Sequence, residues 1–80
     1  MLSLRERASS MGTPLRWLQQ WRQHHELTQA EAALLFGVHH ITYAKWEVGM
    51  RALEGSALRL ATLYRDRPYL VAEEAQKWLS

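Results

Sequence analysis

Cysteine is absent from this 80-residue sequence, which also has only two prolines and four glycines. Without cysteine the chain can form neither a disulfide nor a thiolate metal site, so packing alone must stabilise the fold, as suits a reducing cytoplasm. No apolar run approaches the roughly 20 residues of a membrane span, and no apolar stretch follows Arg5 and Arg7 to complete a secretory signal. We therefore expect a cytoplasmic protein with one small domain and no membrane segment.

Groups that support catalysis or metal binding are also scarce. The acidic residues stand singly, apart from Glu73 and Glu74, whereas a nuclease needs clustered carboxylates and a nucleophile needs an activating base. The histidines form two adjacent pairs, 24–25 and 39–40, and helix neighbours point about 100° apart, which hinders chelation of one ion. For the pair 24–25 we expect a favourable charge interaction with a helix end. We predict no enzyme, no metal site and no cofactor.

The net charge is +2 and the isoelectric point is about 9.4, which permits a polyanionic partner without requiring one. Basic residues outnumber acidic ones over residues 1–65, and the reverse holds over residues 66–80. A surface that binds an anion is therefore expected outside the C-terminal tail.

Apolar residues recur at helical spacing along most of the chain, and no segment alternates as a strand would. Residues 1–13 lack this period and are predicted to form a flexible arm. The remainder is predicted to form five helices, over residues 14–25, 29–36, 39–48, 55–66 and 69–79. These helices indicate an all-α fold in which residues 14–66 form the main domain and residues 67–80 add a C-terminal helix.

Cap residues mark the predicted helix boundaries. The Thr-Pro pair at Thr13 predicts the start of the first helix, and Thr28 with Glu31 forms a capping box for the second. Gly37 and Gly49 are predicted to end the second and third helices, because glycine adopts the left-handed conformation there at least cost. Only a short turn then separates the second helix from the third.

The third helix has two different faces. Tyr43 and Trp46 lie on one face, which is therefore predicted to turn inward. The opposite face carries His40, Ile41, Ala44, Lys45 and Val48. A helix exposed only to water would normally present Glu, Lys and Gln there, so we expect this face to lie against another protein or the DNA major groove.

The segment "LTQAEAALLFGVHHITYAKWEVG", residues 27–49, resembles the helix-turn-helix of the λ-repressor/Cro-like (Xre-type) transcriptional regulators, and residues 15–64 resemble that family more loosely. Its landmarks stand at the family's spacing: Gln29, Ala33, Gly37, Tyr43, Trp46, Glu47 and Gly49. The resemblance implies a small five-helix, λ-repressor-like DNA-binding domain whose recognition helix, about residues 39–48, enters the major groove of double-stranded DNA.

The resemblance also implies roles for individual residues. Base edges would be contacted by His40, Ile41, Ala44 and Lys45. The DNA backbone would be contacted by Thr28, Gln29, His39, Thr42, Arg51, Gly55 and Ser56. Gln29 would hold a phosphate with its amide and the positive end of its helix, and His39 would also cap the recognition helix. In the arm, Arg5 and Arg7 would either follow the DNA or remain in a disordered tail.

A structural ion pair is a further implication of the resemblance. Arg22 and Glu47 are expected to pair and to fix the angle of the recognition helix. Glu26 stands where relatives usually have Gly or Asn, so we expect either a positive φ at a residue with a Cβ or a different turn. The loop over residues 50–55 lacks the proline and extra basic residues that many relatives carry, which weakens the expected phosphate contacts.

The remaining large apolar residues have two interpretations. Trp17, Trp21 and Trp46 are expected in the core rather than as base-stacking platforms. The C-terminal helix carries an apolar stripe that either packs on its own domain or forms a dimer interface, composed of Val71, Ala75, Trp78 and Leu79.

Together these features predict a sequence-specific DNA-binding transcriptional regulator, a repressor that binds a palindromic operator as a homodimer. The alternative is a protein-binding module, such as an antitoxin or an adaptor. In that case a partner protein such as a toxin would dock on Ile41, Ala44 and Val48 together with a patch of Leu34 and Leu35. Binding to DNA should weaken steeply as salt rises, whereas a mostly apolar protein contact should not.

Overall fold

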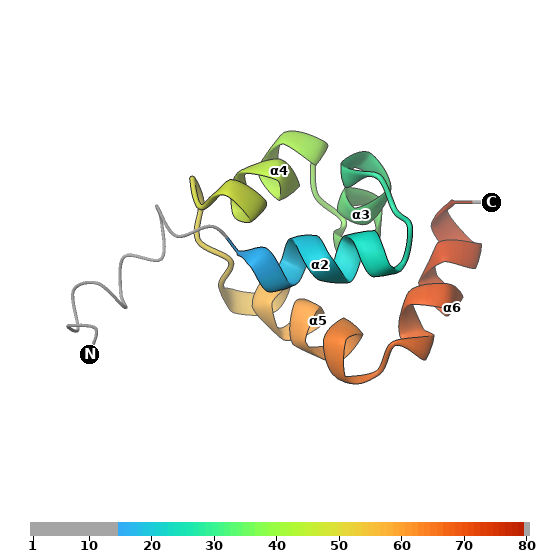
Figure 1. The fold of residues 1–80 in the computed structure, drawn as a ribbon. Coiled ribbons are helices and arrows are strands. Elements are labelled where there is room, and N and C mark those ends of the chain that lie inside the picture. The colour runs from blue at the N-terminus through green and yellow to red at the C-terminus, as the bar shows by residue number, and fades with distance from the viewer. Residues whose placement is uncertain (1–14, 80) are drawn as a thin grey trace.

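The computed structural model describes residues 15–79, which form five helices and no strand (Figure 1). The helices are α2 (Arg16–His24), α3 (Gln29–Phe36), α4 (His40–Val48), α5 (Gly55–Asp66) and α6 (Tyr69–Trp78). The predicted all-α fold is confirmed, and each helix end lies within two residues of its predicted position. The predicted arm over residues 1–13, with its two arginines, lies outside the described residues.

The first helix begins later than the sequence predicts. Thr13 and Pro14 lie outside the described residues, and α2 begins at Arg16, with Leu15 at the cap position and no side-chain cap bond. The backbone N–H of Leu15 instead donates to the backbone carbonyl of Glu47, at 3.1 Å. This bond ties the residue before α2 to the end of α4.

The predicted caps of α3 and α4 are present. The backbone N–H of Glu31 donates to Oγ1 of Thr28 at 3.0 Å, and the backbone N–H of Thr28 donates to Oε1 of Glu31 at 2.8 Å. Gly37 and Gly49 end the two helices in the left-handed conformation, with φ of 68° and 81°. Glu26 also has a positive φ, 55°, so of the two alternatives for the turn before α3 the structure shows the positive φ at a residue with a Cβ.

The centre of the core is an aromatic cluster around Phe36, the last residue of α3. Its ring lies 5.8 Å from Trp21 of α2, 5.8 Å from Tyr43 and 5.5 Å from Trp46 of α4, and 5.5 Å from Tyr64 of α5. Edge-to-face and tilted pairs at this distance add stability beyond the area they bury. Phe36 therefore joins four helices at one point.

Helix α6 packs against α3 and α5 and covers one end of the core (Figure 1). Val71 is only 3% exposed and belongs to the core, so its prediction as a dimer-interface residue is wrong: the domain itself covers this part of the stripe. Ala75 and Leu79 are half-buried, whereas Trp78 is 60% exposed. Among residues 15–79, no helix is long and apolar enough to cross a membrane.

The two leucines of α3 do not form the predicted surface patch. Leu35 is buried in the core and Leu34 is exposed, because consecutive helix residues point about 100° apart. The hydroxyl of Tyr64 donates to the backbone carbonyl of Leu35 at 2.8 Å, which links α5 to the end of α3. Only Leu34 of this pair is available to a partner.

Candidate nucleic-acid interface

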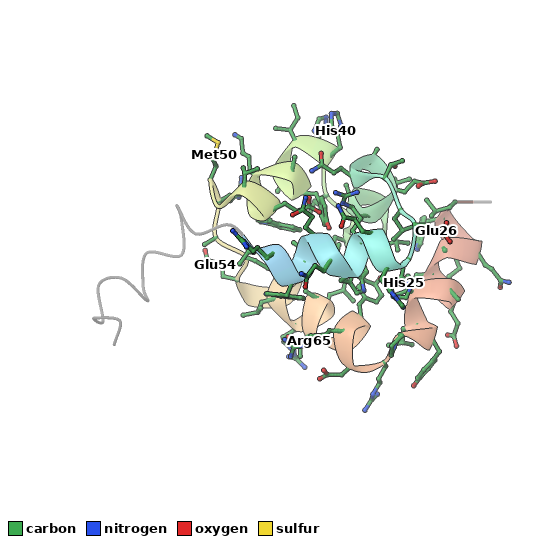
Figure 2. All side chains as sticks on the ribbon, in the orientation of Figure 1. His25, Glu26, His40, Met50, Glu54 and Arg65 are labelled. Atoms are coloured by element: carbon green, nitrogen blue, oxygen red, sulfur yellow. The ribbon has the colours of Figure 1, made fainter. Side chains whose placement is uncertain are left out.

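Helix α4 has its aromatic face inward, as predicted. Tyr43 and Trp46 are buried, whereas Ile41 and Val48 are 51% and 55% exposed. We call the opposite side the open face of α4; it consists of His40, Ile41, Ala44, Lys45 and Val48, of which Ala44 is half-buried and the others are exposed. Figure 2 shows His40 at the start of α4 and Met50 just past its end, both directed away from the body of the molecule.

The turn between α3 and α4 is closed by a histidine cap. His39 is the N-cap residue of α4, and its Nδ1 accepts a hydrogen bond from the backbone N–H of Ile41 at 3.2 Å, which confirms the predicted cap. The ring of His39 also stacks on that of His40, with centroids 4.5 Å apart. Because Nδ1 is the acceptor, neutral His39 carries its proton on Nε2.

The ion pair expected between Arg22 and Glu47 is present. Nε of Arg22 donates to Oε2 of Glu47 at 2.7 Å, and Nη2 donates to Oε1 at 3.2 Å. Nη1 of Arg22 also donates to the backbone carbonyl of Leu27, at 3.0 Å. One guanidinium therefore holds both the end of α4 and the loop that precedes α3.

Gln29 also contacts Glu47, and the sequence analysis did not predict this contact. Its Nε2 donates to Oε1 of Glu47 at 3.0 Å, so the carboxylate accepts three hydrogen bonds, from α2 and α3. We call Arg22, Gln29 and Glu47 the Glu47 cluster. The amide of Gln29 is thus turned toward the protein, and only its second N–H remains for a phosphate. No local sequence signal distinguishes these two orientations.

Electrostatics within the Glu47 cluster favour the charged pair. Burial alone would raise the pKa of Glu47, but the hydrogen bonds from Arg22 and Gln29 outweigh it and hold the pKa below its ordinary value. The pKa of Arg22 is raised by its hydrogen bond to Glu47. Beside the cluster, burial and the nearby carboxylate of Glu47 raise the pKa of Tyr43.

Residues predicted to contact the DNA backbone lie at the starts of α3, α4 and α5 and in the loop between α4 and α5. Arg51, Gly55 and Ser56 are exposed near the start of α5, Thr28 and His39 are exposed, and Gln29 and Thr42 are half-buried. The hydroxyl of Thr28 is already occupied by the capping box. Glu54 is the exposed N-cap residue of α5, so a carboxylate stands at a helix start that is expected to meet a phosphate.

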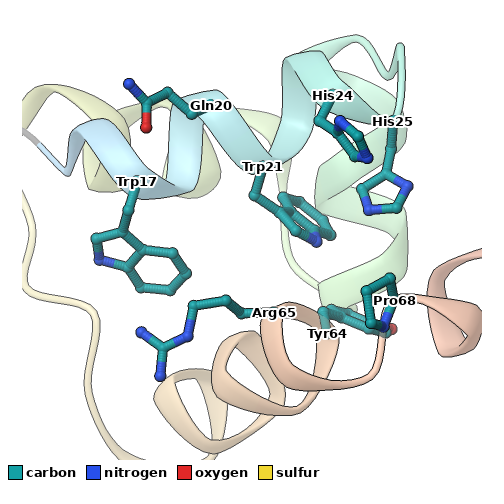
Figure 3. Close-up of a pocket in the computed structure, with 8 residues that line it drawn as sticks. All are labelled: Trp17, Gln20, Trp21, His24, His25, Tyr64, Arg65 and Pro68. Carbon is teal, nitrogen blue, oxygen red and sulfur yellow. The ribbon is translucent and has the colours of Figure 1, made fainter.

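A cleft of about 290 Å³ opens on the other side of α2, between α2 and α5 (Figure 3). Its lining consists of Trp17, Gln20, Trp21, His24, His25, Tyr64, Arg65 and Pro68. Trp21 is buried as predicted and stacks on Tyr64 at 5.6 Å. Trp17 is only half-buried, and Cζ of Arg65 lies 5.2 Å from its ring centre. In Figure 2 this side of the molecule faces away from His40.

One of the two histidines at the end of α2, His25, differs from the prediction. Burial, and to a lesser extent the charge of His24, lowers the pKa of His25 and so favours its neutral form. A favourable charge interaction with the helix end therefore does not describe His25. Within residues 15–79, no three His, Cys, Asp or Glu residues are grouped so that they could hold a metal ion.

Helices α3 and α4 are short and are joined by a tight turn at Gly37, and α4 has its aromatic face buried and its opposite face open. This arrangement defines a helix-turn-helix domain of the DNA-binding class. A family model described as helix-turn-helix matches residues 18–64. The chain belongs to this Xre/λ-repressor-like helix-turn-helix family and is a DNA-binding regulator. No curated protein and no solved structure matches the chain significantly.

Proposed function

We propose that the protein is a cytoplasmic transcriptional repressor that binds a palindromic operator as a homodimer. The observation that supports this function is the orientation of α4, whose aromatic face packs inward while the opposite face is open. Each subunit offers one such helix, so the half-sites lie about one helical turn, or 34 Å, apart. Repression follows from occupation of a promoter and requires no cofactor.

Base contacts are assigned to the open face of α4. Lys45 donates to the acceptors of guanine, His40 donates to a base edge, and Ile41 with Ala44 packs against the floor of the groove. The exposure of His40, Ile41 and Lys45 and the small side chain of Ala44 support this assignment. Each good base contact contributes about 1–3 kcal/mol of discrimination.

Backbone contacts are assigned to the two sides of α4. The first amides of α3 and α5 have no partner within their own helices and can bind phosphate oxygens. The side chains and amides proposed for these contacts belong to Thr28, Gln29, His39, Thr42, Arg51, Gly55 and Ser56. They set the register of the protein on DNA but do not select its sequence.

The proposed dimer interface is the exposed edge of α6. Trp78 supplies most of its apolar surface, and Ala75 and Leu79 lie beside it, half-buried. We expect Trp78→Ala to shift the protein toward the monomer in sedimentation experiments, whereas Tyr69→Ala, at an equally exposed aromatic residue of the same helix, serves as the control. A dimer that is unchanged by Trp78→Ala removes α6 from the interface.

The experiment that tests the proposed function is selection of bound duplexes from a random oligonucleotide pool. We expect enrichment of a two-fold symmetric site whose binding constant falls steeply with salt, because the protein must displace counterions from phosphates. A pool that shows no enrichment over several rounds at low salt contradicts the proposal.

A protein-binding module is the second candidate function. Ile41, Val48 and Leu34 are each more than half exposed, which would also suit docking of an apolar partner such as a toxin. Such a contact would respond weakly to salt, so the salt dependence of any interaction identified in the cell separates the two functions.

A further inference from the structure

The centre of the open face of α4 is apolar. Ile41 and Val48 are each more than half exposed, and seven residues of helix bring them to within about 20° of the same line along its surface. Ala44 lies between them, and Lys45 is the polar residue closest to this line. These three apolar residues form what we call the apolar line. Exposure of these three apolar side chains to water does not stabilise the free protein.

The major groove presents one apolar group on its base edges, the 5-methyl group of thymine; the other exposed groups are hydrogen-bond donors and acceptors. An isoleucine placed against those polar groups would remove their water without replacing its hydrogen bonds, which is unfavourable. A methyl group opposite the apolar line would lose only unfavourable contact with water. The chemistry of the line therefore matches 5-methylpyrimidines.

We propose that this protein recognises its operator through pyrimidine 5-methyl groups that contact Ile41 and Val48. This inference rests on the proposed function. Seven residues of α-helix rise by about 10 Å, more than the spacing of about 3.4 Å between base pairs, so the two side chains face different base pairs. Each half-site therefore contains two methyl-bearing pyrimidines at separate positions, and Lys45, between the two contacts, donates to a purine.

Replacement of thymine by deoxyuridine tests this inference, because it removes the methyl group and leaves base pairing intact. The operator obtained by selection is prepared with each thymine replaced in turn, and binding is measured by fluorescence anisotropy at constant salt. We expect about a fourfold loss of affinity for each contacted methyl group. An operator with cytosine in place of the same thymine should bind weakly, and 5-methylcytosine at that position should recover part of the lost affinity.

Matched variants show whether the methyl groups contact the apolar line. Ile41→Ala should bring the ratio of thymine to deoxyuridine affinity close to one at one position, and Val48→Ala should do so at the other. Leu63→Ala, at an exposed leucine of α5, should leave both ratios unchanged. Because all three side chains are exposed, the variants should fold, as circular dichroism would show.

The outcomes separate this inference from the function on which it rests. Equal affinity for the thymine and deoxyuridine operators overturns the inference and leaves DNA binding intact. A thymine preference that persists in both Ile41→Ala and Val48→Ala also overturns it, because the methyl groups then act through DNA shape. Absence of any selected operator overturns the proposed function itself.

Discussion

Arg22 and Glu47 are joined by two hydrogen bonds, of 2.7 Å and 3.2 Å, although 25 residues separate them in the sequence. Glu47 is 6% exposed, so its charge is compensated by Arg22 and Gln29 rather than by water. Arg22 lies in α2 and Gln29 opens α3, so their hydrogen bonds to Glu47 hold α4 against both helices. The direction of the open face of α4 depends on this contact.

Removal of one partner of this pair should be costly. Arg22→Ala leaves a buried carboxylate without its cation, and we expect the free energy of unfolding to fall by about 3–5 kcal/mol. The double variant Arg22→Met, Glu47→Leu removes both charges and should recover much of this loss. Urea denaturation measures both effects. A loss below about 1 kcal/mol for Arg22→Ala would show that the pair is no stronger than a surface ion pair.

Stability should also depend on the pH in the range where Glu47 titrates. The pKa of Glu47 is lower in the folded protein than its ordinary value of 4.5, so the unfolded state takes up the proton first. The stability from this group is complete above that value and is lost as the pH falls through the lower folded pKa. We expect the free energy of unfolding to fall less steeply below pH 4.5 in Glu47→Gln than in the wild type. Parallel profiles would contradict this.

Recognition of bases and of backbone should respond to different substitutions. Lys45→Ala should relax the base preference at one position, by about 1–3 kcal/mol, because it removes a donor to a base edge. Arg51→Ala should weaken binding to all sequences alike and reduce the slope of log affinity against log salt by about one. Competition binding with single-position operator variants distinguishes these effects. Uniform weakening by Lys45→Ala would place this residue on phosphate instead.

Glu54 should oppose DNA binding. Its carboxylate is exposed at the start of α5, next to the amides proposed to bind phosphate. We expect Glu54→Gln to raise the affinity for all DNA sequences by a few-fold at low salt, and the gain should shrink as salt screens the repulsion. Glu73→Gln, at an exposed residue of α6, removes the same charge away from α4 and should give little change. Equal gains from both variants would indicate an effect of net charge alone.

The sequence predicts those parts of the fold that depend on short-range rules. The capping box at Thr28 and the left-handed glycines Gly37 and Gly49 were identified because their chemistry involves neighbours within four residues. For Glu26, comparison with the family left two alternatives, a positive φ or a different turn, and the structure shows the first. The inward aromatic face of α4 followed from helical periodicity.

Three features that depend on tertiary packing were not predicted from the sequence. Val71 and Trp78 share an apolar stripe in the sequence, but only the structure shows that α3 and α5 cover the first and not the second. The amide of Gln29 turns toward Glu47 because α3 and α4 meet there. The central role of Phe36 arises from four helices that converge on one ring.

An NMR titration tests most directly the claim that the open face of α4 contacts DNA. The ¹⁵N-labelled protein would be titrated with its selected operator, and the amide and indole resonances would be followed. We expect the largest shifts along His40–Val48 and at the first residues of α3 and α5, with little change at the indole of Trp17 in the cleft. Shifts concentrated in the cleft or on α6, with α4 unaffected, would contradict the account.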